Sequence, residues 1–200
     1  MGRTWESPSG NLLVSTIVRL GLHDPAPSTL AFVTALAVFD TIKNIAPEIA
    51  VQVKWPNDIL SADGAKLCGV LLERSGDAVI VGIGLNLAWH PEGLERPVTD
   101  LIALGALPPH PQAVTEILAD AFAIWLERWR IGGMPAIAAS WQKVAHPVGT
   151  AITVHLPTGD IADGLFAGLD DDGALRLRLA DGTVRVIHAG EVRLAPAGTP

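Results

Sequence analysis

The spacing of apolar residues in the first half of the chain predicts a helix packed on a sheet. Apolar and β-branched residues crowd positions 11–19, which predicts a buried strand. Positions 28–45 are apolar on most sides and follow two prolines, which predicts a helix with Ser28 as its N-cap. Three further strands, separated by turn-forming residues, are expected as antiparallel neighbours at 50–55, 66–73 and 78–87.

The second half changes from helical to alternating spacing. A polar, proline-rich connection over 90–111 leads to an amphipathic helix at 112–130, and Gly132-Gly133 separates this helix from a shorter one at 135–141. Short alternating strands with Asp- and Gly-containing turns then predict a small all-β barrel, at 151–156, 161–169, 174–179 and 183–188. The chain therefore divides into a first domain over 1–146, a barrel over 147–195 and a tail over 196–200.

Composition narrows the class of protein. Of the 200 residues, 49% are apolar, which is enough for a real core. The formal net charge of -7 argues against a nucleic-acid-binding surface, which needs clustered lysine and arginine. The single cysteine, Cys68, suits a reducing compartment, and no apolar run reaches membrane-spanning length. We therefore expect a cytoplasmic protein without a nucleic-acid or membrane partner, with the proline-preceding histidines at its surface, namely His90, His110 and His146.

The strand at 78–87 has one emptied face. Period-2 geometry sends alternate apolar residues from Val79 to Leu87 to one side, and Gly82, Gly84 and Asn86 to the other. Because glycine inside a strand costs stability, this pattern indicates a flat ligand that lies against the backbone and contacts Asn86. A barrel-like bend, or a helix packed closely against the glycines, would explain the same pattern.

Two lysines accompany the neighbouring turns. Lys54 points away from the core residues of its strand, and Pro56 holds the next residues, Asn57 and Asp58, in a turn that is ordinary in isolation. Lys66 begins the next apolar strand, either as an edge residue with its ammonium in solvent or as a cation over a phosphoryl or acyl oxygen. The second interpretation requires Lys66 and the glycine face to lie on one side of the sheet, around a common cavity.

Signatures of several other enzyme classes are missing. The sequence contains no Gly-x-x-x-x-Gly-Lys-Ser/Thr phosphate loop, no His-Glu-x-x-His and no Gly-x-Ser-x-Gly. Gly82 and Gly84 also lack the third glycine of a dinucleotide fingerprint. A zinc enzyme and a serine hydrolase are therefore disfavoured.

Three motifs in sequence order resemble those of the bacterial biotin protein ligases, and the resemblance covers essentially the whole chain. They are Lys54-Trp55-Pro56-Asn57-Asp58, the strand from Lys66 to Glu73, and Gly82-Ile83-Gly84-Leu85-Asn86-Leu87, with Gly2-Arg3-Thr4-Trp5 upstream and Gly190-Glu191-Val192 near the end.

The resemblance implies an α+β fold with a mixed, largely antiparallel sheet and flanking helices, as in class II aminoacyl-tRNA synthetases, followed by an SH3-like β-barrel. It also implies a ligase that uses ATP and Mg²⁺ to convert biotin to biotinyl-5'-adenylate. The biotinyl group then passes to a lysine of the biotin carboxyl carrier protein of acetyl-CoA carboxylase or of another biotin-dependent carboxylase.

Residues at matching positions take implied roles. Lys66 and Arg3 correspond to catalytic residues, and Lys66 also contacts biotin. The other implied roles are biotin contacts at Gly69, Leu71, Gly82 and Gly84, ATP contacts at Lys54, Asn57, Asp58 and Asn86, and a Mg²⁺ ligand at Asp58.

The chain departs from the family pattern at its beginning. The family's Ser/Thr-rich biotin contact and the start of its glycine-arginine loop would precede Met1, and only Gly2-Arg3 remains. If this sequence is the whole polypeptide, we expect impaired catalysis, so a nucleotide-binding remnant without turnover is one alternative function. A lipoate-type acyl-adenylating ligase is the other. The absence of the DNA-binding domain of some relatives predicts no repressor role, and a homodimer is a further expectation.

Overall fold

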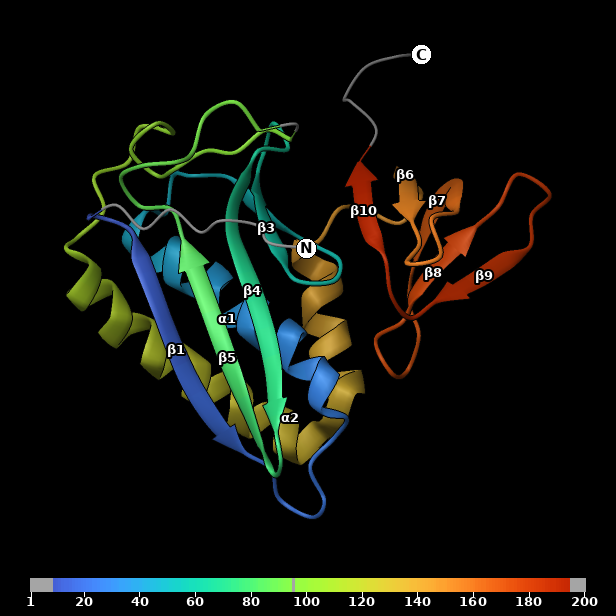
Figure 1. Cartoon of the computed structure of the whole chain (residues 1–200), viewed down its shortest axis with the longest axis horizontal. Coiled ribbons are helices and arrows are strands. Elements are labelled where there is room, and N and C mark those ends of the chain that lie inside the picture. Colours follow the sequence, from blue (N-terminus) through green and yellow to red (C-terminus); the bar gives the residue numbers. More distant parts are fainter. Residues whose placement is uncertain (1–8, 95, 195–200) are drawn as a thin grey trace.

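The computed structural model describes residues 9–94 and 96–194, which form two five-stranded antiparallel sheets and two long helices (Figure 1). Two isolated parallel bridges, Val53 with Ala145 and Lys66 with Val98, add to the antiparallel pairs. The predicted α+β class with a largely antiparallel sheet is therefore confirmed. Arg3 lies outside the described residues.

The first sheet has the strand order β1-β5-β4-β3-β2. One of its strands, β3, was not expected, because it begins at the aspartate of a Pro-Asn-Asp turn and ends just before an Asp-Gly turn, and residues of both kinds favour loops. The strands are β1 (Leu12–Arg19), β2 (Val51–Lys54), β3 (Asp58–Ser61), β4 (Lys66–Ser75) and β5 (Ala78–Leu85).

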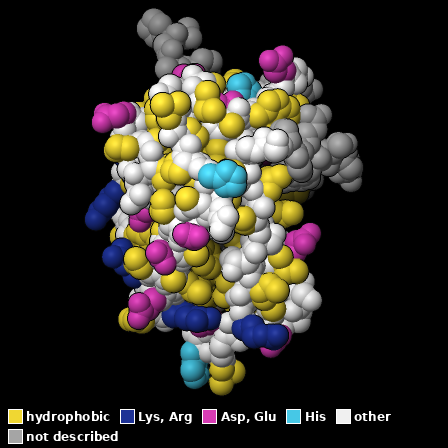
Figure 2. Space-filling view, turned by 90° about the vertical axis from the view of Figure 1, so that its left-hand side faces the viewer, with side chains coloured by type: hydrophobic (Ala, Val, Ile, Leu, Met, Phe, Trp, Pro, Cys, Tyr) yellow, Lys and Arg dark blue, Asp and Glu magenta, His cyan; other side chains and the backbone are white. Residues whose placement is uncertain are grey.

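Strand β1 lies at one edge of this sheet and is not buried on both faces as the sequence suggested. Leu12 and Val18 are buried, whereas Leu13 and Ile17 are 43% and 66% exposed. The exposed pair belongs to the face opposite the helices. Figure 2 views the molecule from the β1 side and shows many hydrophobic side chains at its surface.

Two helices cover the other face of the first sheet (Figure 1). Helix α1 (Leu30–Ile45) follows a 3-10 turn (Pro27–Thr29), and its N-cap is Thr29 and not Ser28. Helix α2 (Pro111–Val144) contains a break at Gly133, where φ is 65°, a value that glycine adopts at little cost. The break separates the two helices that the sequence predicted.

The segment Pro27–Ile45 is long and apolar enough, by length and composition, to cross a membrane. This differs from the sequence analysis, which found no apolar run of membrane-spanning length. In the described part of the chain, 67% of its most apolar window is buried. It lies between the sheet and α2, and a helix with neighbours on both sides is apolar on most of its surface.

The C-terminal module is a second sheet with the strand order β10-β6-β7-β8-β9. It confirms the predicted all-β module and adds β10, which was not predicted as a strand. The change from helix to strands falls between Val144 and Ala151, whereas the domain limits at 146 and 195 stay predictions. The strands are β6 (Ala151–His155), β7 (Ile161–Leu169), β8 (Leu175–Arg178), β9 (Val184–Ile187) and β10 (Glu191–Leu194).

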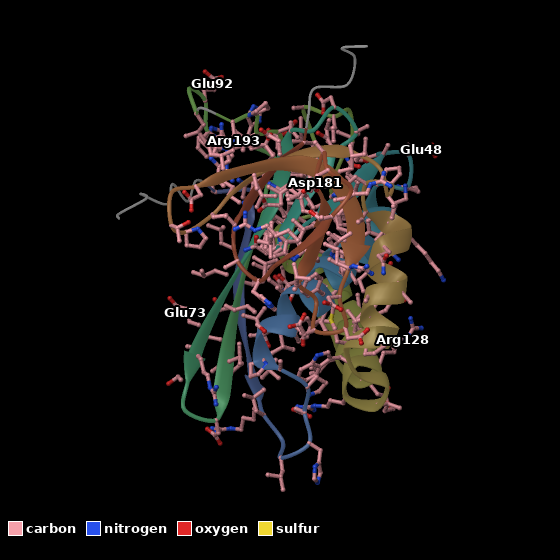
Figure 3. All side chains as sticks on the ribbon, turned by 90° about the vertical axis from the view of Figure 1, so that its right-hand side faces the viewer. Glu48, Glu73, Glu92, Arg128, Asp181 and Arg193 are labelled. Atoms are coloured by element: carbon pink, nitrogen blue, oxygen red, sulfur yellow. The ribbon has the colours of Figure 1, made fainter. Side chains whose placement is uncertain are left out.

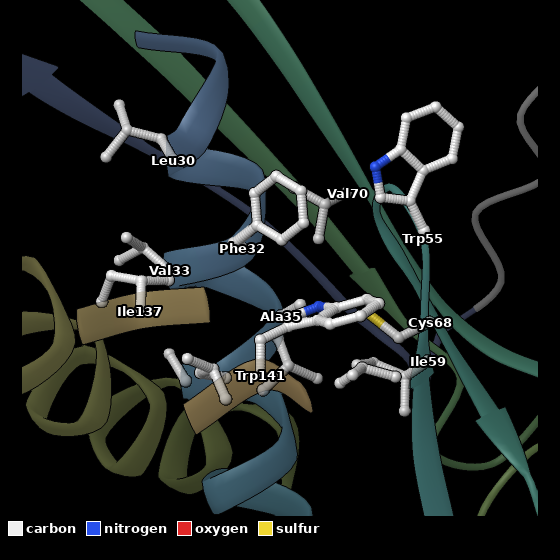
Figure 4. Packing of buried hydrophobic residues seen from close by; sticks show 14 of the residues in the cluster. Leu30, Phe32, Val33, Ala35, Trp55, Ile59, Cys68, Val70, Ile137 and Trp141 are labelled. Carbon is white, nitrogen blue, oxygen red and sulfur yellow. The ribbon is translucent and has the colours of Figure 1, made fainter. Parts of the chain in front are cut away.

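The two modules share one hydrophobic core. The ring of Phe32 on α1 meets Trp141 on α2 edge to face at 5.6 Å, and Trp141 meets Phe166 of β7 at 6.4 Å. Figure 4 shows Phe32 and Trp141 beside Trp55, which follows β2, and beside the sheet residues Ile59 and Cys68. Trp141 is fully buried in this shared core.

Candidate active site

One row of residues crosses all five strands of the first sheet. The register pairs Lys54 with Asp58, Asp58 with Gly69, Gly69 with Gly84, and Gly84 with Leu13. Directly paired residues project from the same face of a sheet, so this row places two charged side chains beside two glycines. It lies on the face opposite the helices.

A second row lies two residues further along the same face. It contains Ser15, Gly82 and Leu71, which are paired across β1, β5 and β4. Among the described residues, the nearest neighbours of a Cβ on Gly82 would be Leu71 and Ser15 of the adjacent strands, at 3.7 to 3.8 Å. The alternative in which a helix packs closely against the glycines is therefore wrong for Gly82, and the face is emptied as predicted.

Asp58 is the centre of the charged cluster. Its Oδ1 contacts the Nζ of Lys66, and its Oδ2 lies 2.9 Å from the Nζ of Lys54. The side chains of Asp58, Lys54 and Lys66 are 7%, 9% and 19% exposed, so the ion pairs are largely shielded from water. Burial by itself raises the pKa of Asp58, but the two lysines outweigh it and the net pKa is lowered.

Gly69 explains how the ammonium of Lys66 reaches this cluster. A Cβ at position 69 would lie 2.9 Å from Lys66 Nζ and 3.0 Å from its Cε. The lysine side chain therefore folds back over the glycine, on the face that carries Gly82 and Gly84. The prediction that Lys66 and the glycine face share one side of the sheet is confirmed.

The predicted common cavity between Lys66 and the glycines stays a prediction. Leu13, Leu71 and Ile17 are 43%, 51% and 66% exposed around the glycines. Two surface hollows formed by described residues lie over β7 and β8 and beside the break in α2. Within residues 9–94 and 96–194, the site is an open face with a charged cluster at one end.

The two candidate asparagines are held by backbone groups. Asn57 donates from Nδ2 to the carbonyl of Val70 at 2.6 Å, and Asn86 donates from Nδ2 to that of Thr99 at 2.9 Å. These bonds fix both side chains, and each retains a carbonyl oxygen and a second N–H. Their contacts with ATP stay predictions.

The surroundings of Asp58 differ from those of a metal ligand. Both of its oxygens face ammonium groups, and a cation placed there would meet like charges. The described residues contain no group of three or more His, Cys, Asp or Glu side chains that could hold a metal ion. The geometry favours Asp58 as a partner of the lysines over its predicted role as a Mg²⁺ ligand.

The C-terminal module reaches the charged cluster through Lys54. Its Nζ donates to the carbonyl of Val192 in β10 at 2.9 Å while it pairs with Asp58. The next residue, Trp55, donates from Nε1 to the carbonyl of Gly173 at 3.0 Å. Sequence reasoning missed both contacts, because the partners are 138 and 118 residues away in the chain.

His146 is buried at the same junction, contrary to the expected surface position. It is 2% exposed, and its ring lies 4.4 Å from that of Phe166. Neither ring nitrogen makes a hydrogen bond of normal geometry in the described part of the chain. Loss of hydration, followed by the nearby Lys54 charge, lowers the pKa of His146 from 6.5 to about 4.

We expect this histidine to weaken the fold at acidic pH. Between pH 6.5 and about 4 the unfolded chain binds a proton at His146 that the folded chain does not, so the free energy of unfolding falls as pH falls. The contribution is at most about 1.4 kcal/mol per pH unit. Urea unfolding of the wild type and His146→Leu across this range measures it, and identical slopes for the two proteins would contradict the assignment.

Comparisons with known proteins agree with these features. Two family models match, "Biotin/lipoate A/B protein ligase family" over residues 1–87 and "Biotin protein ligase C terminal domain" over residues 149–194. A biotin--[acetyl-CoA-carboxylase] ligase from Paracoccus denitrificans is 36% identical over 202 residues, which cover 96% of this chain and 83% of the relative. The corresponding ligase from Mycobacterium tuberculosis is 33% identical over 198 residues, which cover 96% and 72%.

Solved structures support the fold. The biotin protein ligase from Aquifex aeolicus in complex with biotin and ATP superposes with a TM-score of 0.84 at 24% identity, over 98% of this chain and 83% of the other. At this identity the likeness concerns the fold alone. It extends over the sheet, both helices and the C-terminal module.

Proposed function

The chain belongs to the biotin protein ligase family, and on this premise we propose that it joins biotin to a lysine of a biotin carboxyl carrier protein through biotinyl-5'-adenylate, at the expense of ATP. The observation that carries the proposal is the pairing of Lys66 with Asp58 beside the face formed by Gly69, Gly82 and Gly84. A cation next to a cleared sheet face can hold an anionic group and a flat ligand together.

In the first step, a carboxylate oxygen of biotin attacks the α-phosphorus of ATP. The bond from that phosphorus to the bridging oxygen breaks, and pyrophosphate leaves with the electron pair. The ammonium of Lys66 neutralises the negative charge that grows between carboxylate and phosphate. Asp58 fixes the ammonium in place, and Lys54 adds a second positive charge at the same carboxylate.

In the second step, the neutral amine of the acceptor lysine attacks the biotinyl carbonyl carbon. The carbon–oxygen bond to phosphate breaks, AMP leaves, and the amine nitrogen loses a proton to solvent as the amide forms. The mixed anhydride is already activated, so orientation is the main task of the protein. Lys66 serves here by stabilising the departing phosphate oxygen.

We further propose that Mg²⁺ enters with the phosphates of ATP and is not held by Asp58 alone. Mg²⁺ commonly keeps several waters and binds substrate phosphates with one or two carboxylates, and it would supply further charge neutralisation there. The support is the pairing of both Asp58 oxygens with lysines.

Gly69 offers a test of the position of Lys66. We expect Gly69→Ala to lower adenylate formation roughly 10- to 100-fold, because the new methyl group displaces the ammonium by a fraction of an ångström or more. Stability should change little, since the clash involves the far end of a flexible side chain. Gly21→Ala is the matched control, since its Cβ would have 3.5 Å to its nearest neighbour. Full activity of Gly69→Ala would argue against the folded-back lysine.

The family model over residues 1–87 includes lipoate ligases, so the acid must be tested directly. The C-terminal match and the two curated relatives favour biotin. The purified chain is incubated with ATP, Mg²⁺, a carrier domain and either biotin or lipoate. Mass spectrometry of the carrier lysine should show one biotinyl group and no lipoyl group, and the reaction should stop when ATP is omitted.

The opposite outcomes separate the alternatives. Transfer of lipoate would identify a lipoate-type ligase. Calorimetric binding of ATP without formation of any acyl-adenylate would identify a nucleotide-binding protein without turnover, which is the second alternative.

We also propose a cytoplasmic location, no nucleic-acid or membrane partner, and a homodimer. The net charge of -7 and the buried position of Cys68 support the first two proposals. Sedimentation with and without biotin and ATP tests the third.

A further inference from the structure

A third cation lies at the charged cluster, and none of the roles above involves it. The Nη1 atom of Arg96 is 3.9 Å from Oδ2 of Asp58 and 3.9 Å from Oε1 of Glu191. The arginine belongs to the loop after β5, whereas Glu191 begins β10 of the C-terminal module. Arg96 therefore bridges the central carboxylate and the second module.

Backbone hydrogen bonds place Arg96 beside Lys66. The amide of Lys66 donates to the carbonyl of Pro97 at 2.9 Å, and the amide of Thr99 donates to the carbonyl of Lys66 at 3.0 Å. The loop thus runs alongside the start of β4 as a short parallel bridge through Val98. Since Arg96 directly precedes Pro97, its position next to the catalytic lysine follows from the main chain.

The C-terminal module supplies the other neighbour by the same logic. Val192 accepts the hydrogen bond from Lys54, so the preceding residue, Glu191, must lie next to the cluster. Figure 3 views the molecule from this module and shows Arg193 of β10 and Glu92 of the loop at the same end of the molecule. The loop therefore lies beside Lys66, and β10 lies beside Lys54.

The cluster carries an excess of positive charge. Among the residues that the structure describes, Lys54, Lys66 and Arg96 face two carboxylates, Asp58 and Glu191, which gives a formal charge of +1. Arg96 differs from the lysines in two respects. Its side chain is 38% exposed, and at 3.9 Å its contacts are charge contacts and not hydrogen bonds, so its planar set of donors is available to a further anion.

We propose that Arg96 binds phosphate oxygens of ATP, and that Glu191 of the C-terminal module positions it for this contact. The inference rests on the proposed function for the identity of the nucleotide. A guanidinium pairs with phosphate through two parallel hydrogen bonds, which suits a group at the open edge of the cluster. Arg96 is then a binding residue, and Glu191 is a positioning residue.

The direct test is Arg96→Gln. The Kd for ATP, measured by calorimetry, and the KM for ATP in pyrophosphate release should both rise roughly 10- to 100-fold, which is the loss of a charge-assisted hydrogen bond. The KM for biotin should stay within about twofold of the wild-type value. The midpoint of thermal unfolding should stay within a few degrees of that of the wild type. Arg96→Lys should give an intermediate value, because it keeps the charge without the planar donor set.

Arg176→Gln on β8 is the matched control, since this arginine is exposed and lies in the C-terminal module away from the cluster. A double-mutant cycle then tests the role of Glu191. Glu191→Gln should weaken ATP binding in the wild type and have little further effect in Arg96→Gln, because the two residues act through one contact.

Unchanged ATP affinity in Arg96→Gln overturns the proposal, as does an equal loss of affinity for biotin, which would indicate a general disturbance of the site. Additive effects of the two substitutions overturn the role of Glu191. Calorimetric ATP binding does not depend on biotin transfer, so it decides the role of Arg96 even if the wild type transfers no biotin to the carrier.

Discussion

Lys66→Ala is expected to lower the rate of biotinyl-5'-adenylate formation by about 1000-fold, the upper range for the loss of one preorganised charge. The ammonium sits over Gly69 and is oriented by Asp58, so no other described cation occupies the same position. Single-turnover release of pyrophosphate with saturating biotin and ATP measures the chemical step directly. The fold should persist, because Asp58 keeps its contact with Lys54.

Two further variants test whether the loss of rate is specific to the ammonium group at position 66. Lys143→Ala removes an exposed lysine near the end of α2 and should leave the rate unchanged. Lys66→Arg keeps the charge but places a larger, planar group over Gly69, and it should recover only a small part of the activity. Wild-type turnover in Lys66→Ala would remove this residue from the mechanism and with it the central argument for the site.

Those parts of the site that depend on local periodicity could be predicted from sequence. The alternation in β5 placed Gly82 and Gly84 on one face, and the register of the sheet confirms that face. The apolar run that begins at Lys66 likewise predicted β4, and the Gly132-Gly133 pair predicted the break in α2. In each case, neighbours within a few residues determine the conformation.

The features that sequence analysis missed depend on contacts between distant segments. Lys54 was expected to point away from the core residues of its strand, yet the carbonyl of Val192 and the carboxylate of Asp58 hold it in a buried position. His146 precedes a proline, which suggested a loop at the surface, but the C-terminal module covers it. Arg96 lies in a polar connection with no periodic signal. The sequence next to these positions carries no signal that a second module will bury them.

The burial of Lys54 makes Asp58 important for stability as well as for the reaction. We expect Asp58→Ala to lower the free energy of unfolding by about 3 to 5 kcal/mol, because a buried ammonium then loses its carboxylate and faces the Lys66 charge nearby. Urea unfolding at neutral pH measures the loss. Asp181→Ala is the control, since that carboxylate lies on an exposed turn of the C-terminal module (Figure 3), and its removal should change the free energy of unfolding far less than Asp58→Ala does.

The pH dependence separates the charge of Asp58 from its size, and Asp58→Asn keeps the size. The pKa of Asp58 is lowered in the folded protein, since the lysines outweigh the effect of burial. The stability from its charge is therefore fully present above the unfolded value of 3.8 and is lost as pH falls below it through the folded pKa. The gap in unfolding free energy between the wild type and Asp58→Asn should be constant at pH 5 to 7 and shrink below about pH 4. A gap that stays constant into the acid range would mean that Asp58 stabilises the fold by packing and hydrogen bonding, and that the charge of the Lys54, Asp58 and Lys66 cluster contributes nothing to folding.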